Sequence, residues 1–173
     1  MPSMNVKAIA AIAAVLGVAG CGGATPTTQA AVTRPAHLSP SVTPDLEAAA
    51  AAYLAAVAPA NSAIATFQAQ AAALPADASG QDAARVAHPL VAAFQGTDEK
   101  LLRVDWPTDR IRADVQGLVT ADRTFESDLT NVSGQNVFSV AAWGDQISSD
   151  EGRLSAAVSI VRADLGLPPA KTG

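Results

Sequence analysis

Apolar residues return at alternating steps of four and three along most of the chain from residue 44 onward, and this spacing constrains the fold more than any other feature. Such steps place side chains on one face of an α-helix, whereas a half-buried strand alternates every second residue. The clearest set is Ile111, Val115, Leu118, Asp122, Phe125, Leu129 and Val132. Three other stretches repeat the pattern, from Leu46 to Leu74, from Val86 to Val104 and from Val140 to Leu165. We therefore expect four long helices.

Helix-boundary signals separate these stretches. Ser79 followed by Asp82 forms a capping-box pattern, and Gly166 fits a left-handed helix end with Leu167 packed beyond it. Thr43 and Pro44 mark the beginning of the first expected helix, and Trp106 before Pro107 marks the end of the second. Short turns between long helices predict an all-α fold, an antiparallel up-down-up-down four-helix bundle. It would occupy residues 43–169, with 170–173 as a tail.

Composition agrees with a helical fold, and the net charge argues against a nucleic-acid partner. Hydrophobic residues make up 49 % of the chain and aromatic residues 4 %, and alanine is by far the commonest apolar residue. Alanine favours helices and lets them approach closely. The formal net charge of -5 repels phosphate, so we expect no nucleic-acid partner. The alanine bias and low lysine content also suggest a high-GC genome, such as that of an actinobacterium.

The N-terminal segment reads as an export signal. Lys7 precedes an apolar run over residues 8–19, which is too short for a membrane-spanning helix. The run ends in Gly17-Val18-Ala19-Gly20-Cys21, which resembles the bacterial lipobox. The resemblance implies transfer of diacylglycerol to Cys21 and removal of residues 1–20 as a signal peptide. An ordinary secretory signal with an incidental cysteine and a hydrophobic N-terminal helix are the alternatives.

The lipobox resemblance implies a cellular location as well as the lipidation of Cys21. Cys21 is the only cysteine, so an intramolecular disulfide or a cysteine-based metal cluster is not expected. Residues 22–42 are rich in Gly, Thr, Ser and Pro, which is typical of a disordered, flexible linker. We therefore expect a domain held at the cell membrane, on its extracytoplasmic face, by the lipid on Cys21.

Polar residues interrupt the inward sets near the middle of the bundle. When the helices are folded about their turns, Asp122 shares a layer with Ile64, His88-Pro89 and Gly144-Asp145. One interpretation is a polar pocket, in which Gly96, Gly117 and Gly144 leave room and His88 or Arg123 donates to Asp122. Its candidate ligand-binding residues are His88, Asp122, Trp143, Asp145 and Glu151. The other interpretation places these residues at seam edges, solvated or paired, for example Glu151 with Arg112, and makes Trp106 and Trp143 packing residues.

The sequence favours no enzyme class. Nucleophile-elbow, zincin, CxxC and phosphate-loop motifs are absent from it, and Asp122 with His88 is the only candidate catalytic pair, so we expect no cofactor and no metal. In plan the chain resembles small lipoproteins of actinobacteria, a likeness that transfers no activity. We expect a non-enzymatic interaction or accessory module with an envelope protein partner. The alternative is a carrier or sensor of a small amphiphile.

Overall fold

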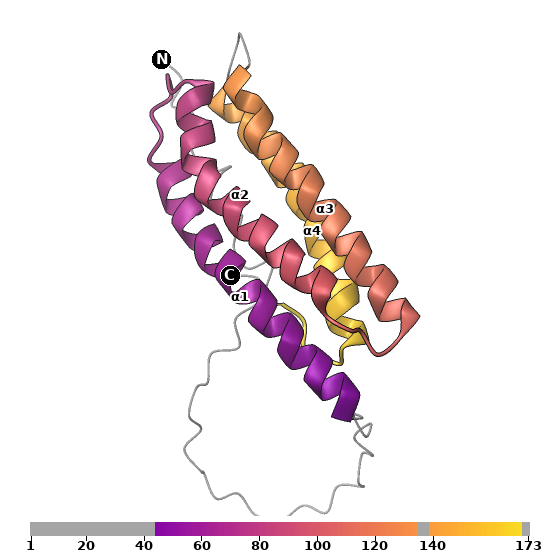
Figure 1. Cartoon of the computed structure of the whole chain (residues 1–173). Helices are drawn as coiled ribbons and strands as arrows, with labels where there is room; N and C mark the ends of the chain where they lie inside the picture. Colours follow the sequence, from indigo (N-terminus) through magenta and orange to yellow (C-terminus); the bar gives the residue numbers. More distant parts are fainter. Residues whose placement is uncertain (1–43, 135–138, 171–173) are drawn as a thin grey trace, which may run out of the picture.

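Four helices build the domain. The structure is a computed structural model that describes residues 44–134 and 139–170. Its elements are α1 (Pro44–Ala72), α2 (Gly80–Arg103), α3 (Asp109–Thr130), the short 3-10 helix η2 (Asn131–Gly134) and α4 (Val140–Asp164). The described residues contain no strand, and Figure 1 shows the helices running side by side. The predicted all-α helical bundle is confirmed.

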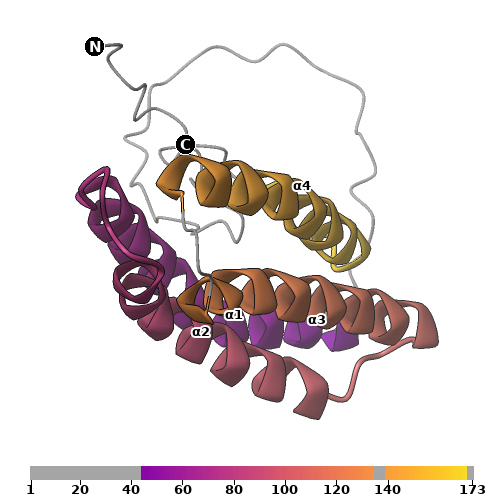
Figure 2. The same ribbon diagram turned by 90° about the horizontal axis from the view of Figure 1, so that it is seen from above.

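The four helices do not contact one another equally. Backbones approach closely between α1 and α2, between α2 and α3, and between α3 and α4, but hardly at all between α1 and α4. Figure 2 shows α4 beside α3 and set apart from the α1–α2 hairpin. Large side chains cross the wider gap. The rings of Phe67 and Trp143 meet edge to face with centroids 5.9 Å apart, which lets α1 and α4 close the bundle without alanine-type close packing.

The predicted inward faces form the core. All seven members of the α3 set are buried, and so are the α1 positions from Ala50 to Ala71 in the predicted set. Tyr53, Phe67, Phe94 and Phe125 are the largest fully buried side chains. Phe94 on α2 packs edge to face on Phe125 of α3, with centroids 5.7 Å apart. Heptad spacing therefore predicted which face of each helix turns inward.

Two predicted helix ends have the expected geometry. The Ser79 hydroxyl accepts from the Asp82 amide at 3.2 Å, and the Asp82 carboxylate accepts from the Ser79 amide at 3.1 Å. Gly166 takes a φ of 66°, and the Leu167 amide donates to the Arg162 carbonyl at 2.8 Å. That bond satisfies a carbonyl of the last helical turn. The capping box and the glycine helix end are both confirmed.

The connection between α2 and α3 sets their relative depth. Val104 and Thr108 have extended backbone at the two ends of this segment. Trp106 is buried between them, and its indole nitrogen donates to the Leu101 carbonyl at 3.1 Å. An extended segment advances about 3.3 Å per residue, twice the rise of a helix. As a result α3 begins about two helical turns beyond the end of α2.

The export signal, Cys21 and the linker lie outside the described residues, so their prediction stays a prediction. Within the described part, α1 is long and apolar enough over Asp45–Ala72 to cross a membrane, with a mean hydropathy of 1.4. Its inner face is core, where Tyr53 and Phe67 pack. Because a core helix of a bundle passes the same test, this property alone does not indicate insertion.

Candidate functional site

The five predicted pocket residues do not lie together. Asp122, Trp143 and Glu151 are buried, whereas His88 and Asp145 are exposed. Neither His88 nor Asp145 is therefore part of an interior pocket. Of the three glycines expected to leave room, only Gly144 is buried, whereas Gly117 is exposed and Gly96 is half-buried. The expected layer through Asp122, His88 and Asp145 was wrong.

The error came from the connections between the helices. Folding about a symmetric turn places His88 opposite Asp122, but the extended segment before α3 brings Asp98 there instead. On the other side, Asp128 of α3 lies against Gln146 of α4, with the amide nitrogen 3.1 Å from the carboxylate. Gly144 and Asp145 are thus at the far end of α3, well away from Asp122.

A buried polar layer does exist, made of different residues. Each helix supplies one ionisable side chain: Tyr53 from α1, Asp98 from α2, Asp122 from α3 and Arg162 from α4, all at most 4 % exposed. The Tyr53 hydroxyl lies beside the Arg162 guanidinium and near the Asp122 carboxyl group. Arg162 Nε also donates to the Pro168 carbonyl at 2.8 Å. This layer joins all four helices through polar side chains.

The centre of the layer is a pair of carboxyl groups. The carboxyl groups of Asp98 and Asp122 lie within reach of each other, and a hydrogen bond between them requires one of the two to carry a proton. Burial, the Asp98 charge and this hydrogen bond raise the pKa of Asp122 to about 9. Burial also raises the pKa of Asp98, although the hydrogen bond from Asp122 and the cation of Arg123 oppose the rise. Arg123, expected as a donor to Asp122, instead lies 3.5 Å from Asp98.

Two further carboxyl pairs join α3 to α4. Asp128 faces Asp150, and Asp114 faces Asp164. The Gln146 amide donates to both members of the first pair, at 3.1 Å and 3.0 Å. Burial and the bond to Asp128 raise the pKa of Asp150, and the bond to Asp164 raises the pKa of Asp114. These sites can each hold a shared proton.

Glu151 is the most isolated of the buried acids. It is 8 % exposed, and its Oε1 atom accepts no hydrogen bond. Burial raises its pKa to about 7. The partner suggested for it, Arg112, instead bonds to Asp109 in the first turn of α3. Glu126 resembles Glu151 in being 8 % exposed, with burial raising its pKa, but the Gln95 amide opposes the rise.

Trp143 has a packing position, as one interpretation of the sequence expected. It is 5 % exposed and lies against Phe67. The indole helps to close the gap between α1 and α4 near the beginning of α4. The structure does not bring Trp143 together with Asp122, because the two lie at different depths of the bundle.

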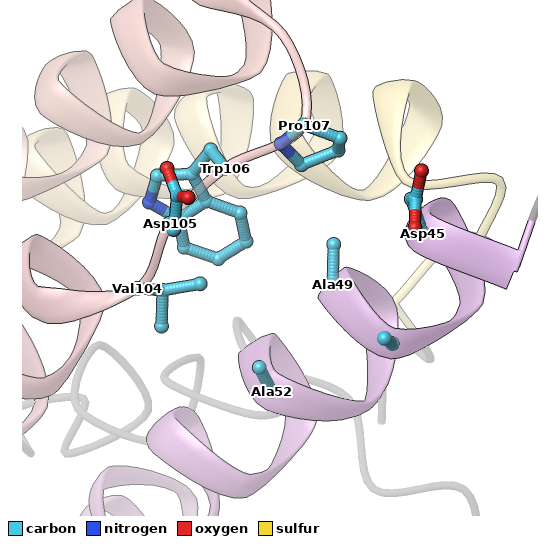
Figure 3. Close-up of a pocket in the computed structure, with 8 residues that line it drawn as sticks. Asp45, Ala49, Ala52, Val104, Asp105, Trp106 and Pro107 are labelled. Atoms are coloured by element: carbon cyan, nitrogen blue, oxygen red, sulfur yellow. The ribbon is translucent and has the colours of Figure 1, made fainter.

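The described part of the structure has an open cavity at the end of the bundle. About 630 Å³ in volume, it lies between the first turns of α1 and the connection after α2. Ala49, Ala52, Val104 and Trp106 face it, and Asp45 and Asp105 lie at its edges (Figure 3). Apolar walls with acidic edges suit a ligand that combines an alkyl or aromatic body with a positive charge.

Several polar core residues were not foreseen. Three of them lie one position away from a residue predicted to face inward. Asp98 follows Thr97, Asp150 precedes Glu151, and Arg162 follows Val161. Those edge positions are solvated in an isolated helix and become buried only when a neighbour covers them. A search for charged residues flanking an interrupted inward position could have found them.

No group of three or more His, Cys, Asp or Glu side chains in residues 44–134 and 139–170 is arranged to hold a metal ion. The chemistry that this part of the chain does offer is proton binding by paired carboxyl groups. No family model, curated protein or solved structure matches the chain.

Proposed function

We propose that the chain is a lipid-anchored accessory module of a bacterial cell envelope, which binds another envelope protein through the outer face of α1. The anchor is supported by the lipobox-like stretch that ends at Cys21. The binding role is supported by one structural observation. Beyond Glu47, no residue of α1 carries a charge, although α1 is 29 residues long and much of it faces outward.

The outer face of α1 differs from the other helices in detail. Beyond Glu47 its exposed residues are uncharged and mainly alanines. The hydroxyls of Ser62 and Thr66 bond back to the carbonyls of Ala58 and Ser62 at 3.3 Å. These hydroxyl donors are therefore already satisfied. A face with few bonds to water to lose is inexpensive to desolvate, and small side chains allow a partner helix close approach. We expect the partner to present a similarly uncharged helix.

Site-specific photo-crosslinking in intact membranes tests the α1 face. A photoreactive residue at exposed Ala55 should give one protein adduct, identified by mass spectrometry, whereas the same residue at exposed Ala156 on α4 should not. A second change on the same face, Ala58→Asp, should abolish the adduct, and Ala156→Asp should leave it. Equal adducts from both helices, or an adduct insensitive to Ala58→Asp, would contradict the proposal.

The anchor is tested separately. Cys21→Ser should move the protein from the membrane fraction to the soluble fraction and remove incorporation of an alkynyl fatty acid. Ser41→Ala, in the same linker region, should change neither property. Retention of Cys21→Ser in membranes would indicate that the N-terminal apolar segment holds the chain instead.

The cavity at the end of the bundle supports a second function, that of a carrier or sensor for a cationic amphiphile. Its volume of about 630 Å³ is in the range of ligand sites. In a Trp143→Phe background, an alkyltrimethylammonium below its micelle concentration should change Trp106 fluorescence. Ala52→Phe, which fills the cavity, should remove that response. If a zwitterionic analogue changed Trp106 fluorescence equally, Asp45 and Asp105 would not select for a positive charge.

A further inference from the structure

Helix α3 meets both of its neighbours through pairs of acids, and a surface arginine of α3 accompanies two of these pairs, Arg123 at Asp98 and Arg110 at Asp164. Asp122 meets Asp98 of α2, whereas Asp114 and Asp128 meet Asp164 and Asp150 of α4. The two α4 pairs are near opposite ends of the α3–α4 contact, and the α2 pair is between them in depth. One helix thus supplies one member of every pair.

The counter-charges around these pairs are few and mostly lie at the surface. Arg123, which is 64 % exposed, reaches Asp98, and Arg153, 69 % exposed, reaches Asp150 at 3.3 Å. Arg110 is 76 % exposed and lies between both acids of its pair, 2.8 Å from Asp164 and 3.8 Å from Asp114. The groups facing Asp122 from the other elements are Tyr53 of α1, Arg162 of α4 beside Tyr53, and Glu126 of α3.

Two carboxylates in contact cannot both be ionised without strong repulsion, and burial increases the cost. A single proton converts the repulsion into a hydrogen bond between a carboxylic acid and a carboxylate. Asp98 and Asp122 are 4 % and 1 % exposed, and the side chain of Asp150 is 2 % exposed. Solvent therefore screens the α2 pair and Asp150 only weakly.

The position of α4 makes it the helix that depends most on these pairs. Its close backbone contacts are with α3, and its contacts with α1 use long side chains such as Trp143 and Arg162. Repulsion at both Asp114–Asp164 and Asp128–Asp150 would act directly on that one extensive contact. By contrast, α1 and α2 meet through alanine and aromatic packing.

We propose that the three carboxyl pairs form an acid-strengthened clamp, which holds α3 to α2 and α4 while each pair keeps one proton and releases α4 from the bundle as those protons are lost. The clamp is a property of the bundle and does not depend on lipid attachment or on a partner for α1. A domain on the outer side of a membrane would meet the pH of the surroundings directly.

The direction follows from the pKa values. Burial raises the pKa of Asp122 to about 9, and the pKa values of Asp98, Asp114 and Asp150 are also raised, as are those of Glu126 and Glu151. An acid whose pKa is higher in the folded state binds its proton more tightly there. Its stabilising effect is complete below the unfolded pKa of about 4 and is lost as pH rises through the folded value. These acids should therefore stabilise the bundle more at mildly acidic than at alkaline pH.

Hydrogen–deuterium exchange of the full chain in a mild nonionic detergent tests the clamp. After correction for the intrinsic pH dependence of exchange, protection of α4 should fall about tenfold or more between about pH 5 and about pH 8.5, and protection of the α1–α2 hairpin should fall less. The melting temperature should drop by at least about 5 °C over the same interval. A melting temperature that rises with pH, or equal loss of protection in all helices, would overturn the proposal.

Isosteric variants identify the groups responsible. Asp122→Asn and Asp150→Asn keep a hydrogen bond in each pair without a titrating proton, so each should reduce the loss of melting temperature between acid and alkaline pH. Asp145→Asn, on the exposed face of α4, should leave that loss unchanged. If a variant fails to fold, infrared spectroscopy of the unaltered protein at about pH 7 shows whether a carboxyl group keeps its proton, through the stretching band of the protonated carboxyl. Absence of that band would overturn the clamp.

Discussion

Single buried residues explain most of the unusual electrostatics. In the part of the chain that the structure describes, the interior holds one buried base, Arg162, and five buried acids, Asp98, Asp122, Glu126, Asp150 and Glu151. An ion-pair core would need nearly equal numbers, and a hydrophobic core would need none. Arg123 and Arg153 reach in from the surface to Asp98 and Asp150, whereas a proton stabilises Asp122 beside Asp98. Burial of these side chains thus depends on pH.

Glu151 allows the simplest test at this scale because its pKa of about 7 is raised by burial alone. The unaltered protein should lose on the order of 2–3 kcal/mol of unfolding free energy between about pH 5 and about pH 8 through Glu151, and Glu151→Gln should remove that loss. The glutamine needs no proton to stay neutral. Urea unfolding at the two pH values measures the difference. Glu99→Gln, at an exposed pair with Arg103, is the matched control and should shift it by less than about 0.5 kcal/mol.

Two elements illustrate how far the sequence predicts this fold. The steps of four and three predicted the buried face of α3 residue by residue, because side-chain direction on a helix is local geometry. The partner of Asp122 could not be predicted in the same way. It depends on how far the backbone travels between Val104 and Thr108, and an extended path there displaced the expected layer by about two turns. The buried face of a helix can be predicted from its own residues. The depth at which two helices meet depends also on the segment that connects them.

Helix α1 raises a question of its own, since Pro59 lies inside a helix that continues from Pro44 to Ala72. Proline lacks the amide that would bond to the Ala55 carbonyl, and its ring is exposed. Pro59→Ala should restore that bond and stabilise the protein by about 1–3 kcal/mol in urea unfolding. Pro75→Ala, in the turn after α1, should not stabilise it. Destabilisation by Pro59→Ala would instead show that a bend at Pro59 is needed to seat both Tyr53 and Phe67.

At the scale of the whole molecule, charge is divided between surface and interior. The formal net charge is -5, and charged groups are concentrated on α2, α3 and α4, whereas α1 has charges only in its first turn. Surface repulsion and interior carboxyl pairs both destabilise the bundle as pH rises. They differ in screening, because salt weakens interactions between exposed charges far more than between buried ones.

Salt therefore separates the two contributions. Raising NaCl from about 0.05 M to about 0.5 M shortens the screening length from roughly 14 Å to roughly 4 Å. At about pH 8 this should raise the melting temperature by a few degrees, because the net negative surface is screened. The fall in melting temperature between about pH 5 and about pH 8 should nevertheless persist for the most part, since Asp122 is 1 % and Asp98 is 4 % exposed. Thermal unfolding followed by circular dichroism across a grid of pH and salt measures both effects. If salt abolished the pH dependence, the exposed charges would be responsible, and the buried pairs would have to be permanently protonated or permanently ionised over that range.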